Sequence, residues 1–215
     1  MAHLIIHRGI VNKQQKENLL KSFKQSFKKG FGIETDIHAT KDHEFICFHD
    51  FTLNRIFKKK ESVKNMQYSQ IKKISARNKK PIPLLEDLLK TSKNKYPLFI
   101  EIKPTFSKKL LQKLLKETSK FSKCIFISFK HKNIYDLLRI KSNAKVGLSF
   151  SLTASVKTII KKSSNKNINC LILDRFFLKN KSIQNLKIKK YYYTIKTKSE
   201  FNKYSKNNNL IFENL

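Results

Sequence analysis

Short apolar runs alternate with amphipathic segments along the whole chain, and this alternation limits the fold more than any other feature. Eight runs of strand length lie at residues 3–7, 32–37, 97–102, 124–128, 145–149, 169–173, 190–195 and 209–213. The segments between them carry apolar residues at helical spacing, as in the leucine stripe of residues 106–121. Eight strands joined by seven helical connections predict an α/β fold, a TIM-type (β/α)8 barrel. A doubly wound open sheet is the alternative, but no glycine-rich phosphate loop follows the first strand.

One further apolar run does not fit the alternation. Residues 45–49 follow the second strand after only a few residues, too few for the crossover that joins parallel strands. The pattern therefore predicts an antiparallel hairpin extension after strand 2. With a tight turn centred on Asp42 and His43, Cys47 is expected opposite His38.

The predicted barrel lacks its final helix, because only two residues follow the eighth strand. Barrel strands are apolar on both faces, so the outward side chains Leu210 and Phe212 need cover. An uncovered patch favours a homodimer or contact with a lipid surface. The alternative is that helices over residues 11–29 and 198–206 close the gap.

Length and composition indicate one domain over residues 1–215, with 40% hydrophobic residues to form its core. No apolar run approaches the roughly 20 residues of a membrane span. The N-terminus lacks the charged lead and apolar core of a signal peptide, so we expect a cytoplasmic protein without a transmembrane segment. Cys47, Cys124 and Cys170 lie far apart in predicted strands, which favours buried thiols over disulfides or a zinc site.

The charge of the chain is strongly positive. Lys and Arg number 47 against 15 Asp and Glu, a formal net charge of +32 that normally indicates a polyanionic partner. The lysines are nevertheless spread evenly, and none of the usual nucleic-acid recognition motifs is present, so no nucleic-acid partner is expected. A bias toward A/T-rich codons explains the same composition. A basic surface also attracts a small anionic substrate.

Acidic side chains gather at the carboxyl ends of two predicted strands. Glu34 and Asp36 are two residues apart and share one face of an extended chain, and Glu101 ends the next barrel strand. Active sites of such barrels lie at this end of the strands. Three carboxylates there are suited to hold a hard divalent cation, such as Ca²⁺ or Mg²⁺, through oxygen ligands.

Basic and imidazole side chains lie beside these acids in the predicted barrel. Arg8 and Lys103 offer positive charge to an anion such as phosphate. His7 and His49 supply an acid and a base near neutral pH. His38 shares the face of the acids but lies further out, so it is a weaker candidate ligand. The combination predicts metal-assisted cleavage of a phosphate ester.

Three neighbouring charges have simpler interpretations. Glu17 is placed to begin a helix, where an acid is favoured. Arg55 is expected to be a solvated surface charge. Asp50 is a candidate to orient His49 or the loop that follows it.

These residues resemble the glycerophosphodiester phosphodiesterase family. The likeness begins at His7-Arg8-Gly9 and continues at residues 34–55, 81–89 and 99–103, with weaker echoes at 127–129, 192–196 and 210–214. Order and spacing agree over nearly the whole chain. The resemblance implies an enzyme that hydrolyses glycerophosphodiesters to an alcohol and glycerol 3-phosphate, with one bound Ca²⁺ or Mg²⁺.

The family roles carry over position by position. The resemblance implies that His7 and His49 transfer protons. It implies that the acids Glu34, Asp36 and Glu101 hold the metal, and that Arg8 and Lys103 bind the substrate phosphate. Which histidine is the base stays open, with a preference for His7. The chain departs from the family where Phe212-Glu213 replaces a closing Thr-Asp.

Two alternatives share the same barrel. One is a lysophospholipase D or C-like enzyme, whose lysophospholipid substrate carries a bulky tail. The other is a catalytically lapsed barrel that binds a phosphodiester without turnover.

Overall fold

The computed structural model describes residues 3–12 and 16–213 of the chain. Within them, eight parallel strands close into a ring in the order β1-β9-β8-β7-β6-β5-β4-β2, and β2 returns to β1. These strands, with β3 outside the ring, are β1 (Leu4–His7), β2 (Gly32–Ala39), β3 (Phe45–Cys47), β4 (Leu98–Ile102), β5 (Cys124–Ser128), β6 (Val146–Phe150), β7 (Cys170–Asp174), β8 (Lys189–Ile195) and β9 (Asn209–Phe212). The predicted TIM-type barrel is confirmed.

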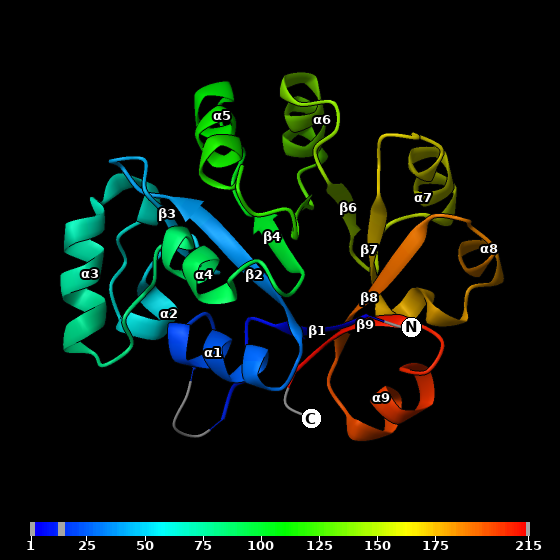
Figure 1. Cartoon of the computed structure of the whole chain (residues 1–215), viewed down its shortest axis with the longest axis horizontal. Coiled ribbons are helices and arrows are strands. Elements are labelled where there is room, and N and C mark those ends of the chain that lie inside the picture. The colour runs from blue at the N-terminus through cyan, green and yellow to red at the C-terminus, as the bar shows by residue number, and fades with distance from the viewer. Residues whose placement is uncertain (1–2, 13–15, 214–215) are drawn as a thin grey trace.

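Helices surround the ring of strands (Figure 1). They are α1 (Leu20–Lys28), α2 (Asn54–Phe57), α3 (Tyr68–Arg77), α4 (Leu85–Ser92), α5 (Lys108–Glu117), α6 (His131–Ile140), α7 (Val156–Ser163), α8 (Lys181–Gln184) and α9 (Lys198–Tyr204), with 3-10 turns η1 (Val63–Asn65) and η2 (Arg175–Lys179). In the described ranges, no helix is long and apolar enough to cross a membrane.

The first helix is shorter than the predicted segment, residues 11–29: α1 begins only at Leu20. Asn18, just ahead of it, is buried against β2 instead of entering the helix. Its side chain accepts a hydrogen bond from Thr35 Oγ1 at 2.8 Å and donates one to Asp36 at 3.3 Å. The chain before α1 therefore braces the strand that carries the acids.

The inside of the barrel changes from apolar to charged along the strands. Its apolar part is formed by Ile5, Phe99, Ile127, Cys170, Ile172, Tyr191 and Ile211, all buried. Because side chains alternate, the residue two positions further along a strand faces the same way. His7 therefore follows Ile5 on the inner face, and Glu101 follows Phe99.

The hairpin extension after β2 is present, but its register differs from the prediction by one residue. β3 pairs antiparallel with β2, and Cys47 lies opposite Ile37 rather than His38. The turn is closed by a hydrogen bond from the backbone N–H of Thr40 to the carbonyl of Glu44, at 3.0 Å. Three residues lie between this pair, so the turn is centred on one residue and the register shifts. As predicted, the three cysteines are buried free thiols.

No helix follows β9 within residues 3–12 and 16–213. The expected exposure of its side chains is nevertheless wrong, since Leu210 is 0% and Phe212 5% exposed. The ring centroid of Phe212 lies 5.4 Å from that of Phe31 and 4.8 Å from that of Phe201 on α9. A groove of about 1120 Å³ remains beside these three rings. A homodimer through this seam stays a prediction.

Candidate active site

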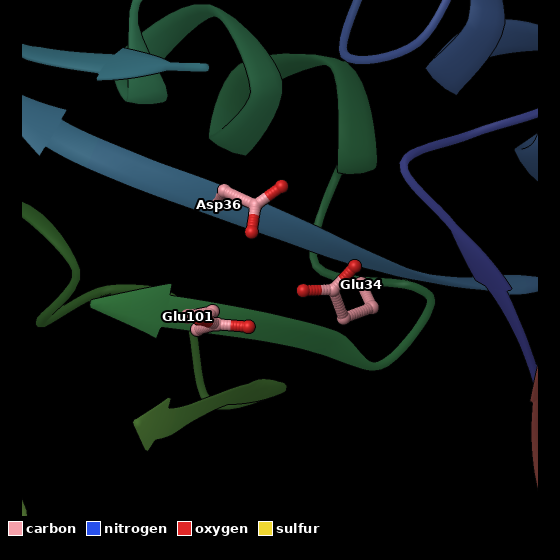
Figure 2. A group of neighbouring side chains, drawn as sticks. All are labelled: Glu34, Asp36 and Glu101. Atoms are coloured by element: carbon pink, nitrogen blue, oxygen red, sulfur yellow. The ribbon is translucent and has the colours of Figure 1, made fainter. Parts of the chain in front are cut away.

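Three carboxylates converge at the carboxyl end of two neighbouring strands. Glu34 and Asp36 extend from β2 and Glu101 from β4, where Asp36 and Glu101 are paired in register. Figure 2 shows the three side chains turned toward one another. One oxygen from each lies within 4.8 Å of the others, and the residues are 3%, 1% and 7% exposed, respectively. The strand geometry thus gathers three buried acids at one point.

Charge repulsion and burial act strongly on these acids. Burial, together with the charges of the other two acids, raises the pKa of Glu34 well above its usual value. Burial and the charge of Asp36 likewise raise the pKa of Glu101 to about 7. Burial opposes ionisation of Asp36 too, but the cations Arg8 and Lys103 outweigh it and lower the pKa of Asp36 to about 2.

The donor set fits a hard divalent cation. Glu34 Oε2 and Asp36 Oδ1 are buried and accept no hydrogen bond from the described part of the chain. An unsatisfied buried carboxylate oxygen is costly, and a cation removes that cost. Oxygen ligands alone, without a thiolate or imidazole, are the set that Ca²⁺ and Mg²⁺ prefer.

Two basic side chains border the acid cluster. Arg8 Nε lies 2.9 Å from Asp36 Oδ2, and Lys103 Nζ lies 2.8 Å from Glu101 Oε1. Arg8 and Gly9 both have positive φ, 57° and 78°, so the chain turns sharply as β1 ends. Glycine adopts this conformation without strain. The turn helps to bring the guanidinium back over the acids.

His7 is held by a carboxylate from the last strand. Its Nδ1 lies 2.8 Å from Glu213 Oε2, and its Nε2 lies 3.8 Å from Glu34 Oε2. The hydrogen bond with His7 lowers the pKa of Glu213 to about 2, with further help from Lys196 and against the effect of burial. Ionised Glu213 accepts a hydrogen bond from the Nδ1–H group of His7, which leaves Nε2 directed to the acid cluster. No role was assigned to Glu213 from the sequence, although it directly follows β9 and stands two positions after the inward-facing Ile211.

His49 has a carboxylate partner of the same kind. Its Nδ1 lies 2.7 Å from Oδ1 of Asp50, and its carbonyl lies 3.1 Å from Nε2 of His38. Burial lowers the pKa of His38 to about 4, so the ring is neutral and donates its Nε2 proton to that carbonyl. His38 is not a member of the acid cluster in the described residues. It fixes the backbone that carries His49, in place of the ligand role considered from the sequence.

A chain of ion pairs joins the acid cluster to His49. Arg8, already paired with Asp36, lies 3.3 Å from Glu17, and Glu17 in turn contacts Arg55. Arg55 Nε donates to Asp50 Oδ2 at 2.6 Å. The hydrogen bonds that Arg55 donates, to Asp50 first and then to Glu17, raise the pKa of Arg55. Arg55 is exposed, as expected of a solvated charge, but it is also ion-paired with Glu17 and Asp50. The interpretation of Glu17 as a helix start is wrong: Glu17 precedes α1 and bridges two arginines.

A cavity of about 480 Å³ contains the reactive groups. Of the residues predicted for the site, it is lined by His7, Arg8, Glu34, His49, Glu101 and Lys103, while Asp36 is buried beneath them. The cavity is also lined by the less polar side chains Ile127, Phe129, Ile172 and Tyr193. The volume suits a small organic ligand. Charged and apolar lining residues together favour a ligand with an anionic part and a less polar part.

Comparison with known sequences gives one family. The sequence profile of the Glycerophosphoryl diester phosphodiesterase family matches residues 7–208. A "Glycerophosphodiester phosphodiesterase" of Caldanaerobacter subterraneus subsp. tengcongensis is 31% identical over 162 residues, which are 68% of this chain and 66% of that protein. The "Uncharacterized protein YqiK" of Bacillus subtilis is 29% identical over 148 residues, 62% of this chain and 60% of its own. The matched regions therefore span less than two thirds of these relatives.

Solved structures share the fold at low sequence identity. A glycerophosphodiester phosphodiesterase from Thermotoga maritima superposes with a TM-score of 0.82 at 19% identity, covering 99% of this chain and 94% of its own. An Oleispira antarctica phosphodiesterase, solved with the product sn-glycerol-3-phosphate, gives a TM-score of 0.83 at 18% identity, covering 98% and 92%. At such identities the likeness concerns the fold.

Proposed function

The chain belongs to the glycerophosphoryl diester phosphodiesterase family, and on this premise we propose that it hydrolyses glycerophosphodiesters to an alcohol and glycerol 3-phosphate. The observation that carries the proposal is a cavity lined by two histidines, each held by its own carboxylate, that lies directly over a cluster of three buried acids. The product found in the Oleispira antarctica phosphodiesterase supports the substrate class.

Glu34, Asp36 and Glu101 would hold one divalent cation, Ca²⁺ or Mg²⁺. A bound cation supplies positive charge that neutralises the phosphodiester and the charge that develops in the transition state. In the structure, Arg8 and Lys103 form ion pairs with Asp36 and Glu101. With a cation bound to these acids, Arg8 and Lys103 would be available to bind phosphate oxygens.

The two histidines divide the proton transfers. In each ring the carboxylate partner fixes the proton on Nδ1 and leaves Nε2 free to exchange one, a common arrangement for acid–base histidines. We assign His7 as the base that deprotonates the nucleophile, because ionised Glu213 stabilises the imidazolium that forms. His49 then protonates the departing alcohol.

The proposal is tested with a panel of glycerophosphodiesters and lysophospholipids, assayed with and without EDTA. We expect release of glycerol 3-phosphate that stops in EDTA and returns on addition of Ca²⁺ or Mg²⁺. Release of a free headgroup from lysophospholipids alone would favour the lysophospholipase D-like alternative. Binding of the diesters without turnover under all these conditions would identify a lapsed barrel.

A further inference from the structure

Exposed large hydrophobic side chains are concentrated at one end of the barrel. In the described residues they are Phe51 at 51%, Phe129 at 41%, Leu152 at 62%, Ile160 at 40% and Phe176 at 73% exposure. Four of them follow the carboxyl end of a strand: Phe51 follows β3, Phe129 β5, Leu152 β6 and Phe176 β7. Parallel strands all open on one face, so the loops after β5, β6 and β7 border the mouth of the cavity. We call Phe51, Phe129, Leu152 and Phe176 the mouth ring.

The members of the mouth ring form two pairs of neighbours. The ammonium of Lys130 lies 5.5 Å from the ring centroid of Phe51, and Lys130 is next to Phe129 in the sequence. Leu152 and Phe176 line one surface depression. Phe129 also lines the active-site cavity, so the ring reaches the edge of the site. Single exposed apolar residues are normal on a protein surface, but four on loops around one opening mark an interaction site.

Basic side chains are interspersed with these apolar ones. Lys130 adjoins Phe129, Arg175 adjoins Phe176, and Lys179 lines the same depression as Phe176; all three are exposed. Arg175 is paired with Glu200 at 2.7 Å, whereas Lys130 and Lys179 form no ion pair within residues 3–12 and 16–213. The whole chain carries a formal charge of +32. The acids Asp174 and Glu200 also line the depression beside Phe176, and Glu200 neutralises Arg175. The face around the mouth therefore combines protruding apolar tips with two exposed lysines, Lys130 and Lys179, that have no ion-pair partner among the described residues.

We infer that this face docks on a bilayer that contains anionic lipid. Apolar tips that enter the acyl boundary, with lysines at the level of the lipid phosphates, are the recurring design of surface-bound proteins. A second copy of the chain is the poorer occupant, because two such faces would bring like charges together. A bilayer offers both negative charge and an apolar interior. This docking surface is independent of the reaction proposed for the cavity.

The absence of tryptophan from the sequence permits a direct test. Phe176→Trp places a single indole in the mouth ring, and Ile160→Trp places one at an exposed position on α7 as the matched control. With phosphatidylcholine vesicles containing phosphatidylglycerol, we expect a blue shift and quenching by brominated lipid for Phe176→Trp alone. Equal shifts in both variants, or no shift in either, would overturn the inference.

Vesicle flotation provides the second measurement and needs no turnover. The unmodified protein should float with anionic vesicles, and the double variant Leu152→Ser/Phe176→Ser should lose affinity by about tenfold or more. Ile160→Ser should bind as the unmodified protein does. Full retention of binding by the double variant would reduce the effect to general charge attraction and refute insertion. A dimer in light scattering that the double variant abolishes would assign the mouth ring to a second copy instead.

Discussion

His7 on the first strand and Glu213 after the last lie 2.8 Å apart, Nδ1 to Oε2, although 206 positions separate them in the sequence. The pair forms because β1 and β9 are neighbours where the ring closes. Of the two ring nitrogens of His7, Nε2 is therefore the one that faces the acid cluster, 3.8 Å from Glu34 Oε2. The orientation of His7, the proposed base, thus depends on the closure of the barrel.

We expect Glu213→Gln to lower kcat by about 10–100-fold with little change in KM, because the amide orients His7 but does not stabilise its charged form. Steady-state kinetics with a glycerophosphodiester measures this. Glu200→Gln removes a carboxylate that pairs with Arg175 outside the cavity, and it should leave kcat unchanged. A normal kcat in Glu213→Gln would show that Glu213 has no part in the reaction.

Substitution of the metal-binding candidates should separate activity from folding. Glu101→Ala and Asp36→Ala should each abolish the activity that depends on a divalent cation. Thermal stability without metal should stay similar or rise in Glu101→Ala, because one of three mutually repelling carboxylates is removed. Activity assays with added Mg²⁺ or Ca²⁺ and thermal unfolding in EDTA test both parts. Full activity in Glu101→Ala would rule out a shared cation site.

The contribution of Glu101 to the stability of the metal-free protein should fall as the pH rises from 5 to 8. The pKa of Glu101 is raised to about 7 in the folded chain, chiefly by burial and Asp36, above its ordinary value of 4.5. The folded state therefore binds the proton more tightly, and the stability this contributes is complete below pH 4.5 and lost through about pH 7. Thermal unfolding in EDTA at pH 5 and pH 8 should show that Glu101→Gln gains stability relative to the unmodified protein as the pH rises. This comparison cancels the opposite contribution of His38, whose pKa burial lowers to about 4. An unchanged difference between the two proteins at the two pH values would contradict this account.

The assignment of base and acid can be tested by the leaving group. His7→Ala and His49→Ala should each lower kcat by about 10²–10⁴-fold. A nitrophenyl diester needs little protonation of its leaving group, so it should restore the rate of His49→Ala much more than that of His7→Ala. Equal recovery of both variants would mean that neither histidine is the dedicated acid.

Arg55 should affect the reaction through Asp50 and His49. Arg55→Gln removes the 2.6 Å contact that holds Asp50, and we expect kcat to fall by about tenfold or more with KM little changed. Arg139→Gln is the matched control, because Arg139 pairs with Asp136 on an exposed helix face, with its nitrogen 2.8 Å from the carboxylate. Equal effects of the two substitutions would indicate a general loss of stability instead.

The strands and the convergence of the acids followed from local pattern. Alternation along a strand determines which side chains face inward, so the common face of Glu34 and Asp36 was readable from residues 32–37. The register of the hairpin could not be predicted from the sequence, because it depends on how the turn between Thr40 and Glu44 closes. The hydrogen bond between Thr40 and Glu44 closes the turn, and the hydrophobic periodicity of the sequence does not predict it.

The ion pairs between residues far apart in the chain could not be predicted from the sequence either. The sequence around Arg55 indicates only a solvated surface charge, and only the folded chain brings Arg55 to Glu17, 38 positions away. The cover over Phe212 has a similar origin, since Phe31 and Phe201 come from opposite ends of the chain. Such contacts depend on tertiary packing that the local sequence does not encode.

The charged and the apolar residues that line the cavity lie on largely different strands. Its charged groups come mainly from β1, β2 and β4, whereas Ile127, Phe129, Ile172 and Tyr193 belong to or follow β5, β7 and β8. Substitutions on the second group can therefore reshape the space left for the alcohol of the proposed reaction while the charged groups stay in place. A library randomised at these apolar positions gives directed evolution a route to new headgroup preferences on an unchanged chemical core.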